Sequence, residues 1–244
     1  GGIRSGADAF KLYDTYGLSL DFTEELAADR GLKVDNAGFD AEFAKQQERA
    51  RHASKMGAVS GAPEYLTLLE KAKTVFLGYD RLEEDGATVI AVFKDGKPTK
   101  RLDKGESGEI IVDRTPFYAE AGGQIGDRGV ISAPGAIATV STCRNAVPGL
   151  STHLVTIDEG AFEAGMKVRL VVDEERREGA MRHHTATHLL NAALRETLGT
   201  HVKQAGSLVA NDRLRFDFSH FQGIDERELR VMENRVHGEI LSNK

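Results

Sequence analysis

A series of short β-forming runs in the middle of the chain constrains the fold most. β-Branched and aromatic residues, which favour strands, are frequent in five runs, at 88–93, 109–112, 138–141, 152–157 and 167–172. Turn signals such as Asp95-Gly96-Lys97-Pro98 separate them. Short strands with turns between them predict a small antiparallel barrel or sandwich over residues 74–173.

The residues before this region carry helix signals. Asp21-Phe22-Thr23-Glu24 has the pattern of a capping box, and Gly31 stands where a helix commonly ends. A second helix is expected to start near Asp35, so that residues 1–56 are predicted to be helical. The small residues of 57–63 then predict a boundary.

The residues after the strand-rich region change character again. A helix is predicted from about 176 to 198, ending at Gly199. A hairpin over 202–209 and 214–218 follows, and a last helix starts near Asp225. Because helices and strands are segregated along the chain, the predicted fold class is α+β.

Composition excludes several classes of protein. The 244 residues include 32 Lys and Arg against 38 Asp and Glu, a net charge of −6. This charge argues against a surface that broadly coats nucleic acid, but leaves a local basic patch open. The single cysteine, Cys143, excludes an internal disulfide framework and an all-cysteine metal site. A reducing, cytoplasmic location is therefore expected.

Neither a membrane-spanning run nor a secretory signal is visible in this sequence. No apolar run approaches the about 20 residues that cross a membrane, and no secretory signal pattern stands at the start. The first residue is Gly1 and the last residues still have a helical pattern. We therefore expect a segment of a longer protein.

The sharpest chemical signal is the His184-Thr185-Ala186-Thr187-His188 segment. Residues at i and i+4 share one helix face, so both imidazoles can bind one metal ion, and zinc is the ion that suits them. The alternative is a pair of ordinary helix-surface histidines. The metalloprotease pattern is excluded because Thr185 stands where that motif needs Glu. A tetrahedral site needs two more ligands, and the possible ones are Cys143, His201 and His220.

Two glycine-bearing segments are further candidates. An apolar run from Thr115 leads into Gly122-Gly123, where the backbone can approach another element or a ligand closely. A plain barrel turn is the alternative. In the hairpin, Gln204 and Ser207 flank Gly206 and offer neutral hydrogen-bonding groups. Ordinary strand polarity explains them equally well.

A group of arginines precedes the histidine pair. Arg176, Arg177 and Arg182 favour contact with phosphate, but Glu174, Glu175 and Glu178 are interspersed among them. A solvated, charged helix is therefore the alternative. If this face does meet phosphate, binding should depend on salt.

Four segments in order resemble alanyl-tRNA synthetases. They are residues 10–25, 114–127, 184–190 and 202–218. The resemblance implies that residues 1–60 end the helical tRNA-recognition region. It further implies that 64–175 form the β-barrel of the editing domain and that 176–244 form a truncated, two-layer α/β editing core. The family completes the zinc site of His184 and His188 with a Cys and a His from a segment expected after Lys244. ATP and Mg²⁺ would belong to an aminoacylation domain before Gly1.

The resemblance also implies a reaction. Synthetases of this family attach alanine to tRNA(Ala), and this part would hydrolyse tRNA(Ala) mischarged with serine or glycine, with neither DNA nor a membrane as partner. Thr187 and Gln204 match pocket residues, while Gly122, Gly123 and Arg182 would meet the tRNA. A freestanding editing protein or a threonyl-type editing domain is one alternative, and the first 60 residues argue against it. A non-catalytic tRNA-binding module is the other.

Overall fold

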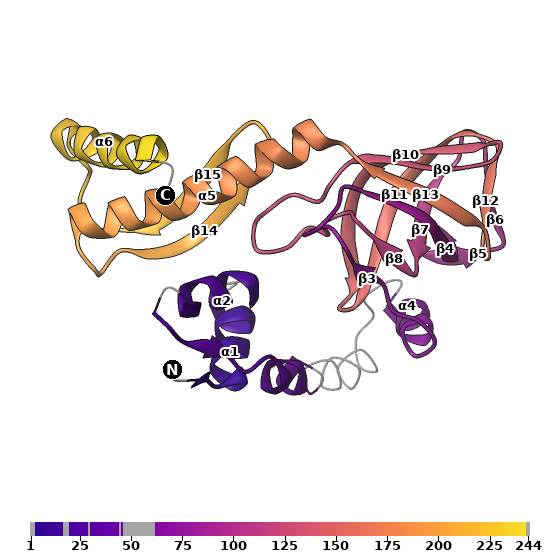
Figure 1. Ribbon diagram of the computed structural model, residues 1–244, viewed down its shortest axis with the longest axis horizontal. Helices are drawn as coiled ribbons and strands as arrows, with labels where there is room; N and C mark the ends of the chain where they lie inside the picture. The colour runs from indigo at the N-terminus through magenta and orange to yellow at the C-terminus, as the bar shows by residue number, and fades with distance from the viewer. Residues whose placement is uncertain (1–2, 17–19, 29, 44, 46–61, 243–244) are drawn as a thin grey trace.

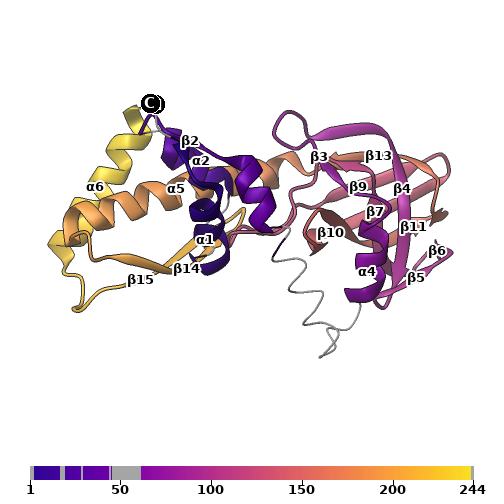
Figure 2. The ribbon, with the colours of Figure 1, turned by 90° about the horizontal axis from the view of Figure 1, so that it is seen from below.

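The computed structural model describes residues 3–16, 20–28, 30–43, 45 and 62–242. A small N-terminal part, a β-barrel and a helix–hairpin unit follow one another along the chain (Figure 1). The long helix α5 (Glu174–Leu198) leaves the barrel and runs along the hairpin (Figure 2). The fold is α+β, as predicted.

Six antiparallel strands form the barrel. They are β4 (Glu83–Lys94), β7 (Ser107–Val112), β9 (Gly129–Ala133), β10 (Ala136–Val147), β11 (Leu150–Glu159) and β13 (Lys167–Val172). The spatial order β13-β9-β10-β11-β7-β4 closes because β13 also pairs with β4. Each predicted run lies within one of these strands, whereas β9 was not predicted.

Short strands complete this part of the chain. β5 (Lys97–Thr99) extends the sheet beyond β4 through the predicted turn, in which Asp95 and Gly96 have φ of 52° and 74°. β6 (Arg101–Asp103) pairs with β12 (Ala161–Glu163). β3 (Val75–Phe76) pairs in parallel with β8 (Arg114–Thr115). Arg177, near the start of α5, donates to the carbonyl of Gly78 just after β3.

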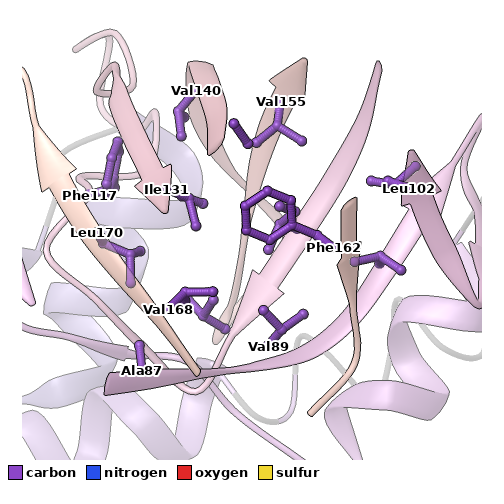
Figure 3. Close-up of a cluster of buried hydrophobic side chains, with 14 of the residues drawn as sticks. Ala87, Val89, Leu102, Phe117, Ile131, Val140, Val155, Phe162, Val168 and Leu170 are labelled. Atoms are coloured by element: carbon purple, nitrogen blue, oxygen red, sulfur yellow. The ribbon is translucent and has the colours of Figure 1, made fainter. Parts of the chain in front are cut away.

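Apolar side chains from all round the barrel fill its interior. Phe117, Phe162, Leu102 and Ile131 are fully buried there (Figure 3). Each such side chain stabilises the fold by about 1.5–3 kcal/mol. Helix α4 (Ala62–Leu69) covers a second cluster on the outside of the barrel, where the Tyr65 ring is stacked on a buried phenylalanine.

The N-terminal part departs from the all-helical prediction. Helices α1 (Gly6–Tyr16) and α2 (Leu20–Ala28) form, and residues 36–43 are helical. However, β1 (Ile3–Arg4) and β2 (Lys33–Val34) form a two-stranded parallel sheet. Asp21 does not cap the start of a helix as predicted, because α2 begins at Leu20 and already contains Asp21. Gly31 has φ +65° as expected of a helix end. Of the predicted break at 57–63, residues 57–61 lie outside the described residues, whereas Ala62 and Pro63 already belong to α4.

The third part confirms its predicted elements. The Asp173 carboxylate accepts a hydrogen bond from the Arg176 backbone N–H at the start of α5, and Gly199 ends the helix. Strands β14 (Lys203–Val209) and β15 (Leu214–Ser219) form the hairpin, and α6 (Glu226–Ser242) follows. Ala193, Leu194 and Met232 form their shared core, so α5 lies between the hairpin and α6 (Figure 1).

Candidate functional site

The two histidines lie one turn apart on α5, as the spacing predicted. The ring centroids of His184 and His188 are 4.8 Å apart, and both side chains are half-buried. Nδ1 of His184 lies 2.7 Å from Oε1 of Gln124 in the barrel. An amide oxygen only accepts hydrogen bonds, so Nδ1 of His184 carries the proton. The lone pair of the ring is then on Nε2.

Burial keeps His188 uncharged. Desolvation, and after it the charge of His184, lowers the pKa of His188 from 6.5 to about 4. The ring is therefore a neutral imidazole at pH 7, which is the form that binds metal ions. The hydrogen bond from His184 to Gln124 is also typical of a metal-binding histidine. Such a bond fixes which ring nitrogen carries the proton and which one can face a metal ion.

The candidates for completing a metal site lie elsewhere. Cys143 is 0% exposed inside the barrel, where burial raises the pKa of its thiol well above the usual range. His201 and His220 hydrogen-bond each other at 2.9 Å beyond the far end of α5. In the part of the chain that the structure describes, no group of three or more His, Cys, Asp or Glu side chains could hold a metal ion. Cys143, His201 and His220 are therefore wrong as partners, and the histidine pair alone would offer a metal ion two ligands.

The Gly122-Gly123 loop joins the barrel to the hairpin. Both glycines have positive φ, of 58° and 84°. The backbone N–H of Val209 donates to the Gly123 carbonyl at 2.8 Å, and that of Ile125 donates to the Val209 carbonyl at 3.0 Å. A Cβ at Gly123 would lie 2.5 Å from the Ser207 carbonyl oxygen. The loop is thus more than a plain turn, because its backbone contacts the hairpin.

We expect Gly123→Ala to weaken this junction, lowering the free energy of unfolding by about 1–3 kcal/mol from backbone strain and from the contact with Ser207. Gly135→Ala is the matched control, because Gly135 has φ +75° and open space around it. Urea denaturation of both variants separates the two causes. Equal losses in both variants would mean that the contact with Ser207 contributes nothing.

The other predicted residues bond or pair within their own helix or hairpin. Thr187 is buried and its hydroxyl donates to the His183 carbonyl at 2.8 Å. Gln204 is exposed on β14, opposite Phe218. Arg182 is exposed and bonds Glu178 at 3.2 Å.

Arg177 is a correction to the predicted phosphate-binding group. Its side chain is 6% exposed and forms a buried ion pair with Asp127. Its guanidinium also donates to the carbonyls of Gly78 at 2.8 Å and Pro116 at 2.7 Å. Because these protein groups already bind its guanidinium, Arg177 holds α5 against the barrel and is not free to bind a phosphate.

A cavity of about 270 Å³ opens beside the histidine pair. His184, Thr185 and Met181 of α5 form one wall, and Gln124 lies beside them. The remaining lining residues are Phe76, Gly78, Tyr79, Tyr118 and Arg177. The cavity therefore lies between α5 and the barrel, next to the bond from His184 to Gln124.

Comparison with known proteins shows the family of the chain. A family model described as tRNA synthetases class II (A) matches residues 3–176. The chain belongs to this family. It is 48% identical over 242 residues to an alanine–tRNA ligase of Stenotrophomonas maltophilia, with 99% of this chain and 27% of the relative covered. An alanine–tRNA ligase of Xanthomonas axonopodis pv. citri is 46% identical over 241 residues, with the same coverage.

This member of the synthetase family thus spans about a quarter of the length of these relatives. The match extends through all four segments on which the resemblance rests. Of the helices that the structure describes, none is long and apolar enough to cross a membrane.

Sequence reasoning did not single out Gln124, Asp127 and Tyr79 as residues of the site in this synthetase segment. Gln124 directly follows the glycine pair, and that position was its only signal. Asp127 and Arg177 are 50 residues apart, so that nothing local pairs them. Tyr79 lies in a short connection after β3 with no motif around it.

Proposed function

We propose that this chain is the part of an alanine–tRNA ligase that hydrolyses tRNA(Ala) mischarged with serine or glycine. The observation that carries the proposal is the hydrogen bond from His184 to Gln124, at the junction of barrel, hairpin and α5. It orients His184 beside a cavity, with the neutral His188 one helical turn away. The complete ligase would attach alanine to tRNA(Ala) with ATP and Mg²⁺ in its other parts, in the cytoplasm.

The chemistry of alanine selection creates the need for such a site. One methylene changes binding by only about 1–3 kcal/mol, and a small pocket rejects an added hydroxyl poorly. Glycine and serine differ from alanine in these two ways. A second site that hydrolyses the wrong ester corrects the error.

The residues that would hold zinc are His184 and His188, with the remaining ligands from outside the described residues. When bound, zinc would supply Lewis-acid polarisation of the ester carbonyl or of an attacking water. Gln124 keeps the proton of His184 on Nδ1, so the Nε2 lone pair is available to a metal ion. The reaction adds water to the ester carbonyl and releases the ribose oxygen of the tRNA.

Other residues would position the substrate. Thr187 donates its proton to the His183 carbonyl, and its oxygen lone pairs are suited to accept a hydrogen bond from a serine hydroxyl. The Gln204 amide would hold the substrate or the water. Gly122 and Gly123 would let the loop lie close to the tRNA end, and exposed Arg182 would meet a phosphate.

A non-catalytic tRNA-binding module is the second candidate. The observation that favours it is that the described residues include only two of the ligands that a zinc site needs. In that case the two histidines are ordinary packed side chains, and the chain contacts tRNA without hydrolysing the ester.

Hydrolysis of seryl-tRNA(Ala), with alanyl-tRNA(Ala) as the control substrate, tests the proposal. The assay compares this chain with the full-length ligase, each with zinc and after chelation. We expect hydrolysis of the seryl ester by the full-length ligase and at least a 100-fold loss in its His188→Ala variant, the scale on which essential catalytic groups act. His237→Ala, an exposed histidine on α6, should leave the rate unchanged. If the full-length ligase fails to cleave the seryl ester, or His188→Ala matches the wild type, the second candidate replaces the first.

A further inference from the structure

Aromatic side chains dominate the cavity beside His184. The rings of Phe76 and Tyr79 are 5.0 Å apart and nearly perpendicular, and Tyr118 lies 6.1 Å from Phe76 on its other side. Tyr79 is 70% exposed and Met181 is 57% exposed. The cavity therefore offers solvent-facing aromatic and thioether surface, which monomeric proteins do not ordinarily leave in one place.

The surrounding backbone holds these rings in position. A Cβ at Gly78 would lie 2.3 Å from the Pro116 carbonyl oxygen, so the two segments are in close contact. Arg177 bonds the carbonyls of both residues. The Asp127 carboxylate also accepts the backbone N–H of Tyr118 at 2.7 Å. The buried ion pair thus preorganises two of the aromatic walls, which lowers the entropy cost of binding a ligand.

The lining indicates the chemistry of the ligand. Flat aromatic rings and a methionine bind a planar π system, and the amide of Gln124 adds hydrogen-bonding capacity at the edge. The only cation in the lining, Arg177, is neutralised by Asp127, so the cavity does not suit a phosphate. A seryl or glycyl group is too small and too polar to fill a cavity that three aromatic rings line. The volume of about 270 Å³ lies just below the range of about 300–1,000 Å³ for small-molecule sites, which suits one ring system.

We propose that this cavity binds the terminal nucleobase of the tRNA, stacked on Tyr79. The inference rests on the proposed function, because His184 belongs both to the cavity wall and to the histidine pair. The reacting ester is attached to the ribose of that terminal nucleoside. A base held in the cavity therefore places the ester beside the histidines. Tyr79 is a positioning residue in this scheme.

Binding of uncharged RNA tests the inference without any hydrolysis. The probes are an acceptor-stem minihelix of tRNA(Ala) with its complete CCA end and the same RNA without the terminal adenosine. Fluorescence anisotropy at one salt concentration gives the Kd of each for the 244-residue chain. Base stacking on an aromatic side chain predicts that Tyr79→Ala weakens binding of the complete RNA about 5- to 150-fold. Tyr79→Phe keeps the ring and should stay within about twofold. Phe221→Ala removes an exposed aromatic (78%) from the hairpin end of the molecule and should change nothing.

The double comparison decides the outcome. The shortened RNA should bind the wild type as weakly as the complete RNA binds Tyr79→Ala, and Tyr79→Ala should not weaken the shortened RNA further. The inference is overturned if the terminal adenosine makes no difference, if its effect persists in Tyr79→Ala, or if neither RNA binds. Seryl-tRNA(Ala) hydrolysis by the full-length ligase is measured separately. If hydrolysis is normal but RNA binding does not depend on the terminal adenosine, only this inference is wrong. If RNA binding depends on the terminal adenosine but the full-length ligase does not hydrolyse seryl-tRNA(Ala), only the proposed function is wrong.

Discussion

Replacing Arg177 with Met should lower the free energy of unfolding by about 3–5 kcal/mol, the typical cost of removing one partner from a buried ion pair. Asp127 would be left as an uncompensated charge, 5% exposed at its side chain. The carbonyls of Gly78 and Pro116 would also lose their donors. Because these groups hold α5 against the barrel, chemical denaturation followed by circular dichroism should show a large drop in the midpoint.

The matched control for this experiment lies one helical turn and a half further along α5. Arg182 forms an exposed ion pair with Glu178, and such pairs contribute about 0–1 kcal/mol. Arg182→Met should therefore change stability by less than about 1 kcal/mol. Arg177→Lys keeps the charge but loses the planar fork, and should fall between the two variants. An Arg177→Met variant as stable as Arg182→Met would show that the buried pair does not hold the two elements together.

The second large effect is expected at Gln124, which sequence analysis did not single out. Gln124→Leu removes the acceptor for Nδ1 of His184, so the proton is no longer confined to that nitrogen. Losing a hydrogen bond behind a metal-binding histidine commonly reduces metal affinity or activity about 10- to 100-fold. We expect that loss both in zinc affinity, measured by competition with a chromophoric chelator, and in seryl-tRNA(Ala) hydrolysis by the full-length ligase.

Two further variants sharpen this prediction. Gln124→Glu restores an acceptor at the same position and should recover most of the loss. Gln222→Leu removes an exposed glutamine from the segment after the hairpin and should have no effect. If Gln124→Leu retains wild-type zinc affinity and hydrolysis, then the bond to His184 does not orient a metal ligand. Loss in Gln124→Glu equal to that in Gln124→Leu would point instead to the amide N–H donors of Gln124, because a carboxylate has the same shape but donates no hydrogen bond.

Local patterns determined the elements of this protein. β-Branched runs located the barrel strands. Helix α5 begins after Asp173 and ends at Gly199, close to the predicted limits. The helical repeat alone put His184 and His188 on one face, because i and i+4 are neighbours on any α-helix. These inferences succeed because backbone geometry and hydrogen bonding act over a few residues.

The tertiary structure decided which of these elements meet. Gln124 reaches His184 across 60 residues of sequence, and Asp127 reaches Arg177 across 50. The charge pattern around Arg177 favoured a solvated or phosphate-binding arginine, whereas its position at the junction of α5 and barrel buries it. Cys143 had the right chemistry for a metal ligand, but the register of β10 turns it into the core. Such pairings depend on how whole elements pack, and no local pattern along the chain encodes them.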